Sequence, residues 1–160
     1  MPAFLQLGDV KGEAQDQDHK EWIMVESFST PIVRSVAHGA RNQERKNGQT
    51  TLGDILIVRK LDKSTPKLME SCATGKFIDA AKIDLCATIN GKQVPRFQIA
   101  LKNVIVTSHN FHAHESMSPS PSEEISLSFT DIEWTYTAYD DKGNKTGNVP
   151  AKYNPHTSAA

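Results

Sequence analysis

Three of the six histidines of the chain fall within seven residues, at His109, His112 and His114 in the stretch SHNFHAH. Imidazole nitrogens bind zinc, and three protein ligands plus a water make a catalytic zinc site. His112, His114 and the adjacent Glu115 would supply such a set if a loop gathered them. The spacing matches no zinc-hydrolase motif such as HExxH. We therefore predict a surface loop with no metal or catalytic residue, and a zinc hydrolase stays as an alternative.

Other signatures of catalysis are absent from the sequence, which contains no GxSxG, P-loop or GxGxxG pattern. Neither Cys72 nor Cys86 has a CxxC partner, and two cysteines are too few for a disulfide framework. We interpret them as two buried thiols, with a bridge between them left open. No histidine neighbours Cys72, so a thiol nucleophile has little support. The sequence thus indicates a protein that is not an enzyme and needs no cofactor.

The composition is that of one soluble globular domain, with 160 residues, 38% hydrophobic and 23% charged, and a formal net charge of −1. A near-neutral chain has no global field to attract nucleic acid or an anionic membrane. No stretch approaches the roughly 20 apolar residues that span a bilayer. The first residues, MPAFLQLGDVKGE, lack the basic region of a secretory signal. We expect a chain that begins in the cytoplasm.

The elements that would position any site are mostly strands, because apolar residues alternate with a period of two. Such alternation runs through residues 22–29, 52–59, 83–89, 97–106 and 125–136. It slips phase near Asn103 and near Thr130-Asp131, and a β-bulge at each place would restore the faces. Asn90-Gly91 lies between two apolar runs and predicts a tight hairpin.

One short helix is predicted over residues 65–74, in DKSTPKLMESCATGKF. A Ser-Thr-Pro start and Gly75 just after the end are typical helix boundaries. Leu68, Met69 and Cys72 would share the face that packs on a sheet. Several strands and one helix predict a mainly β protein, a closed barrel or a sandwich.

Two long loops are expected to interrupt the strands, at residues 36–50 and 108–124. There is no internal repeat and no domain-sized linker. We therefore predict a single domain over residues 1–150 and a flexible C-terminal tail over residues 151–160.

The charges are unevenly distributed along the chain. Residues 9–26 hold six acids against two lysines, a net of −4, and residues 34–46 hold four basic residues against Glu44, a net of +3. Two solvated loops would explain this pattern. The functional interpretation is a dipolar molecule that associates head to tail.

Four segments carry a resemblance to a known family. They are FLQLGDVKGEAQDQDHKEWIMVESFS, RKLDKSTPKLMESCATGKF, FQIALKNVIVTS and ISLSFTDIEWTYTAYDDKGNKTG. In this order and spacing they resemble the haemolysin-coregulated protein (Hcp) family of bacterial type VI secretion systems. The resemblance covers the chain from about Phe4 to Val149.

The resemblance implies a small β-barrel of two antiparallel sheets with one helix at its side. It implies that six copies form a ring with a wide pore, and that rings stack into a tube inside a contractile sheath. The partners would be further copies, the sheath and spike proteins, and effector proteins carried in the lumen. No nucleic acid, membrane insertion or cofactor belongs to this role. The protein would be cytoplasmic before firing, then secreted without a cleavable signal peptide.

The resemblance also implies roles for particular residues. Ser29 corresponds to a side chain that faces the lumen and contacts cargo. The loop at 36–50 corresponds to an extended loop that reaches an adjacent subunit or ring. Many members are glycine-rich there, whereas this chain is basic, so its stacking is expected to be electrostatic and sensitive to salt. The expected ring-stacking residues are Arg41, Asn42, Glu44, Arg45 and Lys46.

Two further interpretations remain beside the zinc hydrolase. One is a tail-tube protein of a phage-like contractile particle, although the GDVKGE run favours secretion. The other is a monomeric barrel that binds a small ligand, which predicts one chain per particle.

Overall fold

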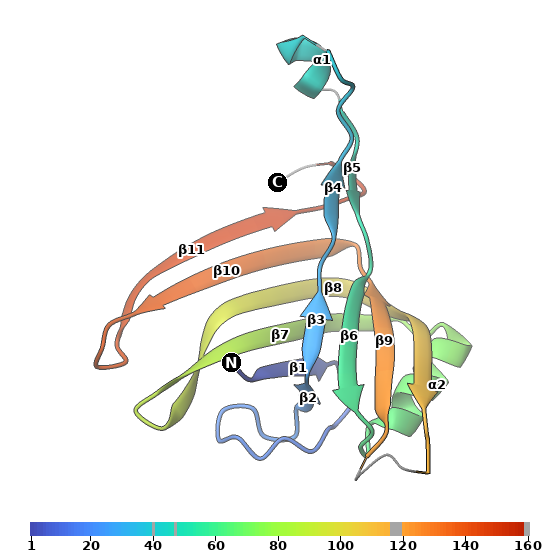
Figure 1. The fold of residues 1–160 in the computed structure, drawn as a ribbon, viewed down its shortest axis with the longest axis vertical. Coiled ribbons are helices and arrows are strands. Elements are labelled where there is room, and N and C mark those ends of the chain that lie inside the picture. The colour runs from blue at the N-terminus through green and yellow to red at the C-terminus, as the bar shows by residue number, and fades with distance from the viewer. Residues whose placement is uncertain (40, 47, 116–119, 159–160) are drawn as a thin grey trace.

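The computed structural model describes residues 1–39, 41–46, 48–115 and 120–158. As predicted, the fold is mainly β (Figure 1). Its strands are β1 (Ala3–Leu7), β2 (Ile23–Val25), β3 (Ser27–Ser29), β4 (Ile32–Arg34), β5 (Thr50–Leu52), β6 (Ile55–Lys60), β7 (Ile78–Ile89), β8 (Lys92–His112), β9 (Ser122–Ser128), β10 (Asp131–Tyr139) and β11 (Lys145–Tyr153). Its helices are α1 (Asn42–Lys46) and α2 (Thr65–Thr74).

The main sheet runs in the order β2-β1-β7-β8-β9-β6-β3, and all of its pairs are antiparallel. β10 pairs with β8 and carries β11 at its outer side, while β4 and β5 form a separate two-stranded ribbon. The closed barrel expected from the sequence is not formed. β2 and β3 are consecutive pieces of one stretch joined by Glu26, whose N–H donates to the Val58 carbonyl at 2.9 Å. The chain thus crosses from one edge of the sheet to the other without closing a ladder.

The core lies between the curved halves of this sheet. Leu5, Ile83 and Ile99 stand in register across β1, β7 and β8, and each is fully buried. Fully burying one such side chain stabilises the fold by about 1.5–3 kcal/mol. The other buried apolar members are Ala3, Leu7, Ile23, Val25, Ile55, Ile57, Leu68, Ile78, Ala81, Leu101, Val104, Val106, Ile125, Leu127 and Ile132.

The predicted hairpin at Asn90-Gly91 is confirmed. β7 ends at Ile89, β8 begins at Lys92, and the two loop residues have φ of 51° and 76°. Positive φ at both central positions is the geometry that Asn-Gly favours in a two-residue turn.

The two phase slips of the sequence meet at one corner of the fold, and neither is the predicted bulge. Asn103 has φ of 49°, where β8 leaves its pairing with β10 and goes on to pair with β9, while its register with β7 continues unshifted. Thr130 lies in the short connection between the end of β9 and the start of β10. The register of β8 shifts at two other places. One lies opposite Leu85 and Cys86 in its pairing with β7, and the other lies around Thr107 in its pairing with β9.

The predicted helix at residues 65–74 is confirmed as α2, and Gly75 ends it with φ of 63°. Leu68 is buried against the sheet and Cys72 is half-buried, but Met69 is exposed, so the predicted apolar face is narrower than expected. Both cysteines are free thiols, so the bridge that the sequence left open is not formed.

Three expectations about loops need correction. The loop at residues 36–50 contains a second helix, α1, at the tip of the β4–β5 ribbon. The loop expected over 108–124 is shorter, because β8 continues to His112 and β9 begins at Ser122. The tail expected from residue 151 is part of β11 as far as Tyr153, which pairs with Ile132.

Candidate functional site: the projecting arm and the hydroxyl face

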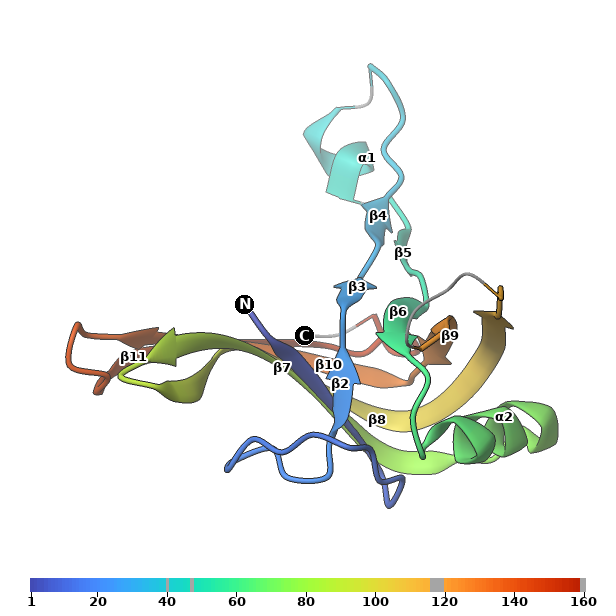
Figure 2. The same ribbon diagram turned by 60° about the horizontal axis from the view of Figure 1, so that its bottom comes forward.

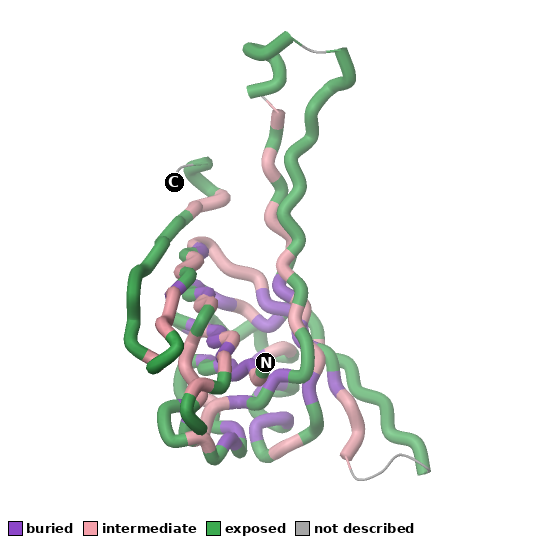
Figure 3. The backbone as a smooth tube through the Cα atoms, turned by 60° about the vertical axis from the view of Figure 1, so that its left-hand side comes forward, coloured by how far each residue is buried: buried purple, intermediate pink, exposed green. Residues whose placement is uncertain are grey.

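The most prominent feature of the molecule is an arm, which we define as β4, α1 and β5. It projects away from the sheets in both ribbon views (Figures 1 and 2). None of its described residues is buried, and Figure 3 shows it in the exposed and intermediate colours along its length. Ile32 and Val33 are exposed by 53% and 61%. An element with no core of its own, and with apolar side chains in water, is typical of an interaction surface.

Short-range hydrogen bonds hold the tip of the arm in shape. The Arg41 N–H donates to the Glu44 carboxylate at 2.9 Å, which satisfies a free donor at the start of α1. Arg34 donates to Thr50 Oγ1 at 2.8 Å and to the carbonyl of Lys46. Of the five residues predicted to stack rings, the structure places all at this tip, Arg41 beside α1 and the other four within it.

Ser29 lies on a polar sheet face. The register places Ser29, Leu56, Ser126 and Ser108 side by side across β3, β6, β9 and β8. Because opposed residues share a face, Ser126 and Ser108 continue, beyond Leu56, the surface that Ser29 begins. We call these three serines, with Thr107 and Ser122, the hydroxyl face. It is the opposite side of these strands from the apolar row Phe28, Ile57 and Ile125.

Hydrogen bonds organise the hydroxyl face. The bulge at Thr107 brings its hydroxyl within 2.8 Å of Ser126 Oγ, and it also donates to Asp54 Oδ2 at 2.6 Å. Ser108 Oγ contacts Ser126 Oγ as well. Ser29 takes part in no such bond among the described residues and is exposed at the edge, so its hydroxyl is available to a partner.

The histidine stretch is mostly strand, which corrects the prediction of a surface loop. The side chain of His109 is only 6% exposed, and its Nε2 lies 3.1 Å from Glu123 Oε2. His112 is exposed, with Nε2 3.3 Å from the Asn110 amide. Within the described residues, no three His, Cys, Asp or Glu side chains are grouped to hold a metal ion. The alternative of a zinc site at His112, His114 and Glu115 therefore gains no geometric support.

A buried ionic cluster, missed at the level of sequence, joins α2 to the sheet. The Arg59 guanidinium contacts Glu123 Oε1 at 2.6 Å, Ser64 Oγ at 2.7 Å and the carboxylate of Asp62. Thr65 Oγ1 donates to the same Glu123 oxygen at 3.1 Å. Burial raises the pKa of Asp62, but hydrogen bonds from Ser64 and Arg59 outweigh it and leave that pKa below its usual value. The cluster fixes the start of α2 rather than offering a reactive group.

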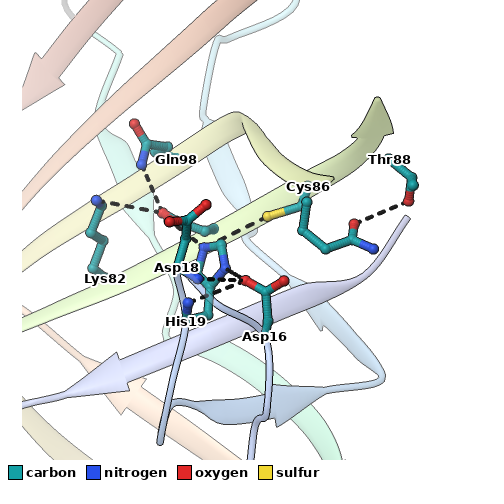
Figure 4. Close-up of polar contacts among 9 residues, drawn as sticks. Asp16, Asp18, His19, Lys82, Cys86, Thr88 and Gln98 are labelled. Atoms are coloured by element: carbon teal, nitrogen blue, oxygen red, sulfur yellow. Dashed lines mark hydrogen bonds and ion pairs between the residues drawn. The ribbon is translucent and has the colours of Figure 1, made fainter. Parts of the chain in front are cut away.

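A second buried cluster surrounds His19, within the acidic segment of residues 9–26 (Figure 4). Its Nδ1 lies 2.5 Å from Asp16 Oδ1 and its Nε2 lies 3.1 Å from Asp84 Oδ2. The ring stacks on Phe4, with centroids 4.4 Å apart and planes at 8°, and meets the edge of Trp22. With one ring nitrogen against each carboxylate, His19 ties the loop between β1 and β2 to β7.

Cys86, His19 and Asp84 together have the residue types of a thiol nucleophile with its base. The Cys86 sulfur lies 3.8 Å from His19 Nε2. Burial, followed by the charges of Asp84 and Asp16, raises the pKa of Cys86 to about 12. Because the thiolate is the nucleophile, a buried thiol with this pKa is unreactive at neutral pH. The cluster is structural.

Sequence reasoning missed both clusters because one acid of each, Glu123 or Asp84, is far along the chain from the residue that it contacts. A signal for one was present. Arg59 occupies a core-facing position in the alternation of Ile55 and Ile57, and a buried cation in such a place requires an acidic partner.

In the part of the chain that the structure describes, none of the helices is both long and apolar enough to cross a bilayer.

Comparisons with known proteins place this architecture. A family model described as type VI secretion system effector, Hcp, matches residues 4–136. Protein hcp1 of Pseudomonas aeruginosa is 31% identical over 150 residues, covering 94% of this chain and 91% of that protein. The solved structure of a type six secretion system protein has a TM-score of 0.91 at 21% identity, covering 99% of this chain and 98% of the other. Hcp1 from Salmonella typhimurium has a TM-score of 0.77 at 21% identity, covering 98% and 96%.

The two solved structures establish the shared fold, with the same course of the chain from end to end. The family model spans most of the sequence, and the Pseudomonas relative matches over nearly its full length. The chain therefore belongs to the Hcp family of type VI secretion system proteins.

Proposed function

We propose that this chain is the tube subunit of a type VI secretion system. Six copies form a ring, and rings stack head to tail into a tube that is surrounded by sheath proteins and tipped by a spike. The protein is cytoplasmic before firing and is then exported with the tube. Its role is structural rather than catalytic.

The observation that carries this proposal is the arm. None of its described residues is buried, and it exposes Ile32 and Val33 to water. A monomer gains nothing from ordering such a segment, whereas an assembly covers it with a neighbouring subunit. The sheet supports the same conclusion, since β11 is an outer strand that is exposed along nearly its whole length. Unpaired strand edges of this kind are covered by neighbours in a closed ring.

The hydroxyl face is the proposed cargo contact. Ser29 begins it, and the neighbouring serines of β9 and β8 extend it over four strands. Hydroxyl groups both donate and accept hydrogen bonds. Such a surface holds a folded effector through polar contacts that release it readily.

The native mass in solution tests the ring. Light scattering on a sizing column should give six times the chain mass, and negative-stain images should show rings. A stable monomer at micromolar concentration would overturn the proposal. Cargo binding is tested separately with Ser29→Gln, which should lower the amount of effector that copurifies with intact rings. The variant Thr74→Gln, at the exposed end of α2, serves as the control.

A further inference from the structure

The oppositely charged segments lie at opposite ends of the molecule. The tip of the arm is at one end of the longest axis, and the loop between β1 and β2 is at the other (Figures 1 and 2). Copies arranged head to tail along this axis bring a basic arm tip toward an acidic loop of the next copy. The structure further shows which of these charges remain available.

Three of the six acids of the acidic segment have ion-pair partners among the described residues. Glu21 pairs with Lys11 at 2.9 Å and with Lys63 at 3.9 Å, and Glu26 pairs with Lys60 at 3.7 Å. Asp16 is held by His19, as described above. Asp9 forms no ion pair among the described residues. It lines an open hollow with Lys67 and Glu70, and its charge, after the hydrogen bond to Glu70, helps to raise the pKa of Lys67.

Two acids of the segment remain. Glu13 and Asp18 are exposed, and neither side chain forms an ion pair with any described residue. They flank Gln15 and Gln17, which are also exposed. The result is an exposed polar surface beside the buried His19, with two carboxylates that form no ion pair with the described residues. Asp18 also borders a hollow that Lys82 and Lys145 line.

The arm tip has the complementary property. Its one acid, Glu44, accepts a hydrogen bond from the Arg41 N–H. Arg34 donates hydrogen bonds to the Thr50 hydroxyl and to the Lys46 carbonyl. The side chains of Arg41, Arg45 and Lys46 are exposed and pair with no acid among the described residues. The arm tip thus keeps a net positive charge, with three exposed cations that pair with no acid among the described residues, at the end opposite Glu13 and Asp18.

We propose that Glu13 and Asp18 are the receptor for the arm tip of a copy in the adjacent ring, with Arg41 and Arg45 as the main contacts. This inference rests on the proposed function, because it names the partner surface used in stacking. Arginine suits it, since its planar fork binds carboxylates through two hydrogen bonds. The contact is exposed, so its strength falls as salt screens it over about 8 Å at 0.15 M ionic strength.

Charge reversal tests the proposal. The double variant Arg41→Glu with Arg45→Glu should keep the six-chain ring but lose ring-to-ring association, measured by sedimentation velocity at low salt. The control, Arg41→Lys with Arg45→Lys, keeps the charge and should retain most stacking. The reciprocal variant Glu13→Lys with Asp18→Lys should also lose stacking alone. A mixture of arm-reversed and loop-reversed rings should stack again, by at least tenfold over either ring alone.

Disulfide trapping gives a second measurement that does not depend on stable stacking. In a Cys72→Ser background, Arg45→Cys combined with Asp18→Cys should form covalent ladders on mild oxidation. The control pairs Arg45→Cys with Glu133→Cys, on the outer sheet face, in place of Asp18→Cys, and it should form no covalent ladders. Intact rings without ladders and without charge rescue would overturn the receptor while leaving the tube proposal standing. Loss of the ring in the arm-reversed variant would show that the arm serves its own ring, which also overturns the receptor.

Discussion

The side chain of Asn103 donates to the hydroxyl of Thr130 at 2.9 Å, across 27 residues of chain, at the corner where two strands change direction. The Thr130 N–H donates to the Lys102 carbonyl at 3.0 Å in the same place. Asn103 has φ of 49°, a region that asparagine enters more readily than most residues. One asparagine therefore supplies both the turn of β8 and the bond that fixes it.

Replacing Asn103 tests the corner. Asn103→Val should lower the free energy of unfolding by about 2 kcal/mol or more, because a β-branched residue resists this backbone and the bond is lost. Asn103→Gly keeps the backbone geometry and should cost about 1 kcal/mol. Urea denaturation followed by tryptophan fluorescence gives both values. Equal losses for valine and glycine would contradict the role of the backbone.

The buried charge of Glu123 gives a second prediction. Glu123→Gln leaves the Arg59 guanidinium with reduced compensation in the core and should cost about 3–5 kcal/mol. The matched control is Glu124→Gln, at the next position but exposed, which should change stability by less than about 0.5 kcal/mol. Thermal and urea unfolding of the two variants compare them directly. Similar stability of both would show that the ion cluster contributes little.

Acid should destabilise the fold through Asp62 and Asp16. Burial raises the pKa of each carboxyl, but hydrogen bonds, from Ser64 and Arg59 to one and from His19 to the other, lower it overall. A lowered pKa means that the unfolded chain binds protons first, so this stabilisation is complete above about pH 5 and is lost as pH falls below about 3.9. Urea midpoints from pH 7 to pH 3 should show the decline. Asp62→Asn should flatten it, and an unchanged slope would exclude Asp62 as a source.

Thiol labelling distinguishes the two cysteines. The pKa of Cys86 is raised to about 12, chiefly by burial. At pH 8 the thiolate would be about one molecule in ten thousand. Iodoacetamide should therefore modify Cys72 alone in the native protein and both thiols in guanidinium chloride, as peptide mass spectrometry would show. Rapid native labelling of Cys86 would mean that the His19 cluster opens in solution.

Shortening the arm should leave the body intact. Replacing residues 34–50 with Asn-Gly keeps the pairs Ile32–Leu52 and Val33–Thr51 and closes the ribbon with a two-residue turn. Since no residue that the structure describes in the arm is buried, the free energy of unfolding should change by less than about 1 kcal/mol. Ring stacking should be lost. A large drop in stability of the isolated chain would show that the arm supports the fold itself.

The sequence predicted those features whose causes are local. The helix at 65–74 and the hairpin at Asn90-Gly91 depend on boundary residues that act within a few positions. The slips at Asn103 and Thr130 were visible too, but their meaning depends on which strand pairs with which. The alternation of apolar residues shows which face of a strand is buried, but it does not show which strands pair.

The same limit applies to the candidate functional site. The basic arm was identified from its composition and its resemblance to Hcp proteins. The extension of β8 to His112 was not, because the apolar alternation stops at Val106 while pairing with β9 continues through a polar face. The acids that form no ion pair were also beyond the sequence, since pairs such as Glu21 with Lys11 and Glu26 with Lys60 depend on how the chain folds.

β8 has a mechanical consequence. It is one uninterrupted strand of 21 residues, roughly 70 Å of chain at about 3.3 Å per residue, and it belongs to both halves of the sheet on either side of Asn103. A thrust or pull delivered to one half reaches the other through covalent bonds as well as through packing. Separating the halves requires tearing this strand from β9 or from β10 along its length, where many hydrogen bonds resist together. For the proposed tube subunit, this continuous strand predicts that the two halves of the sheet move together under load.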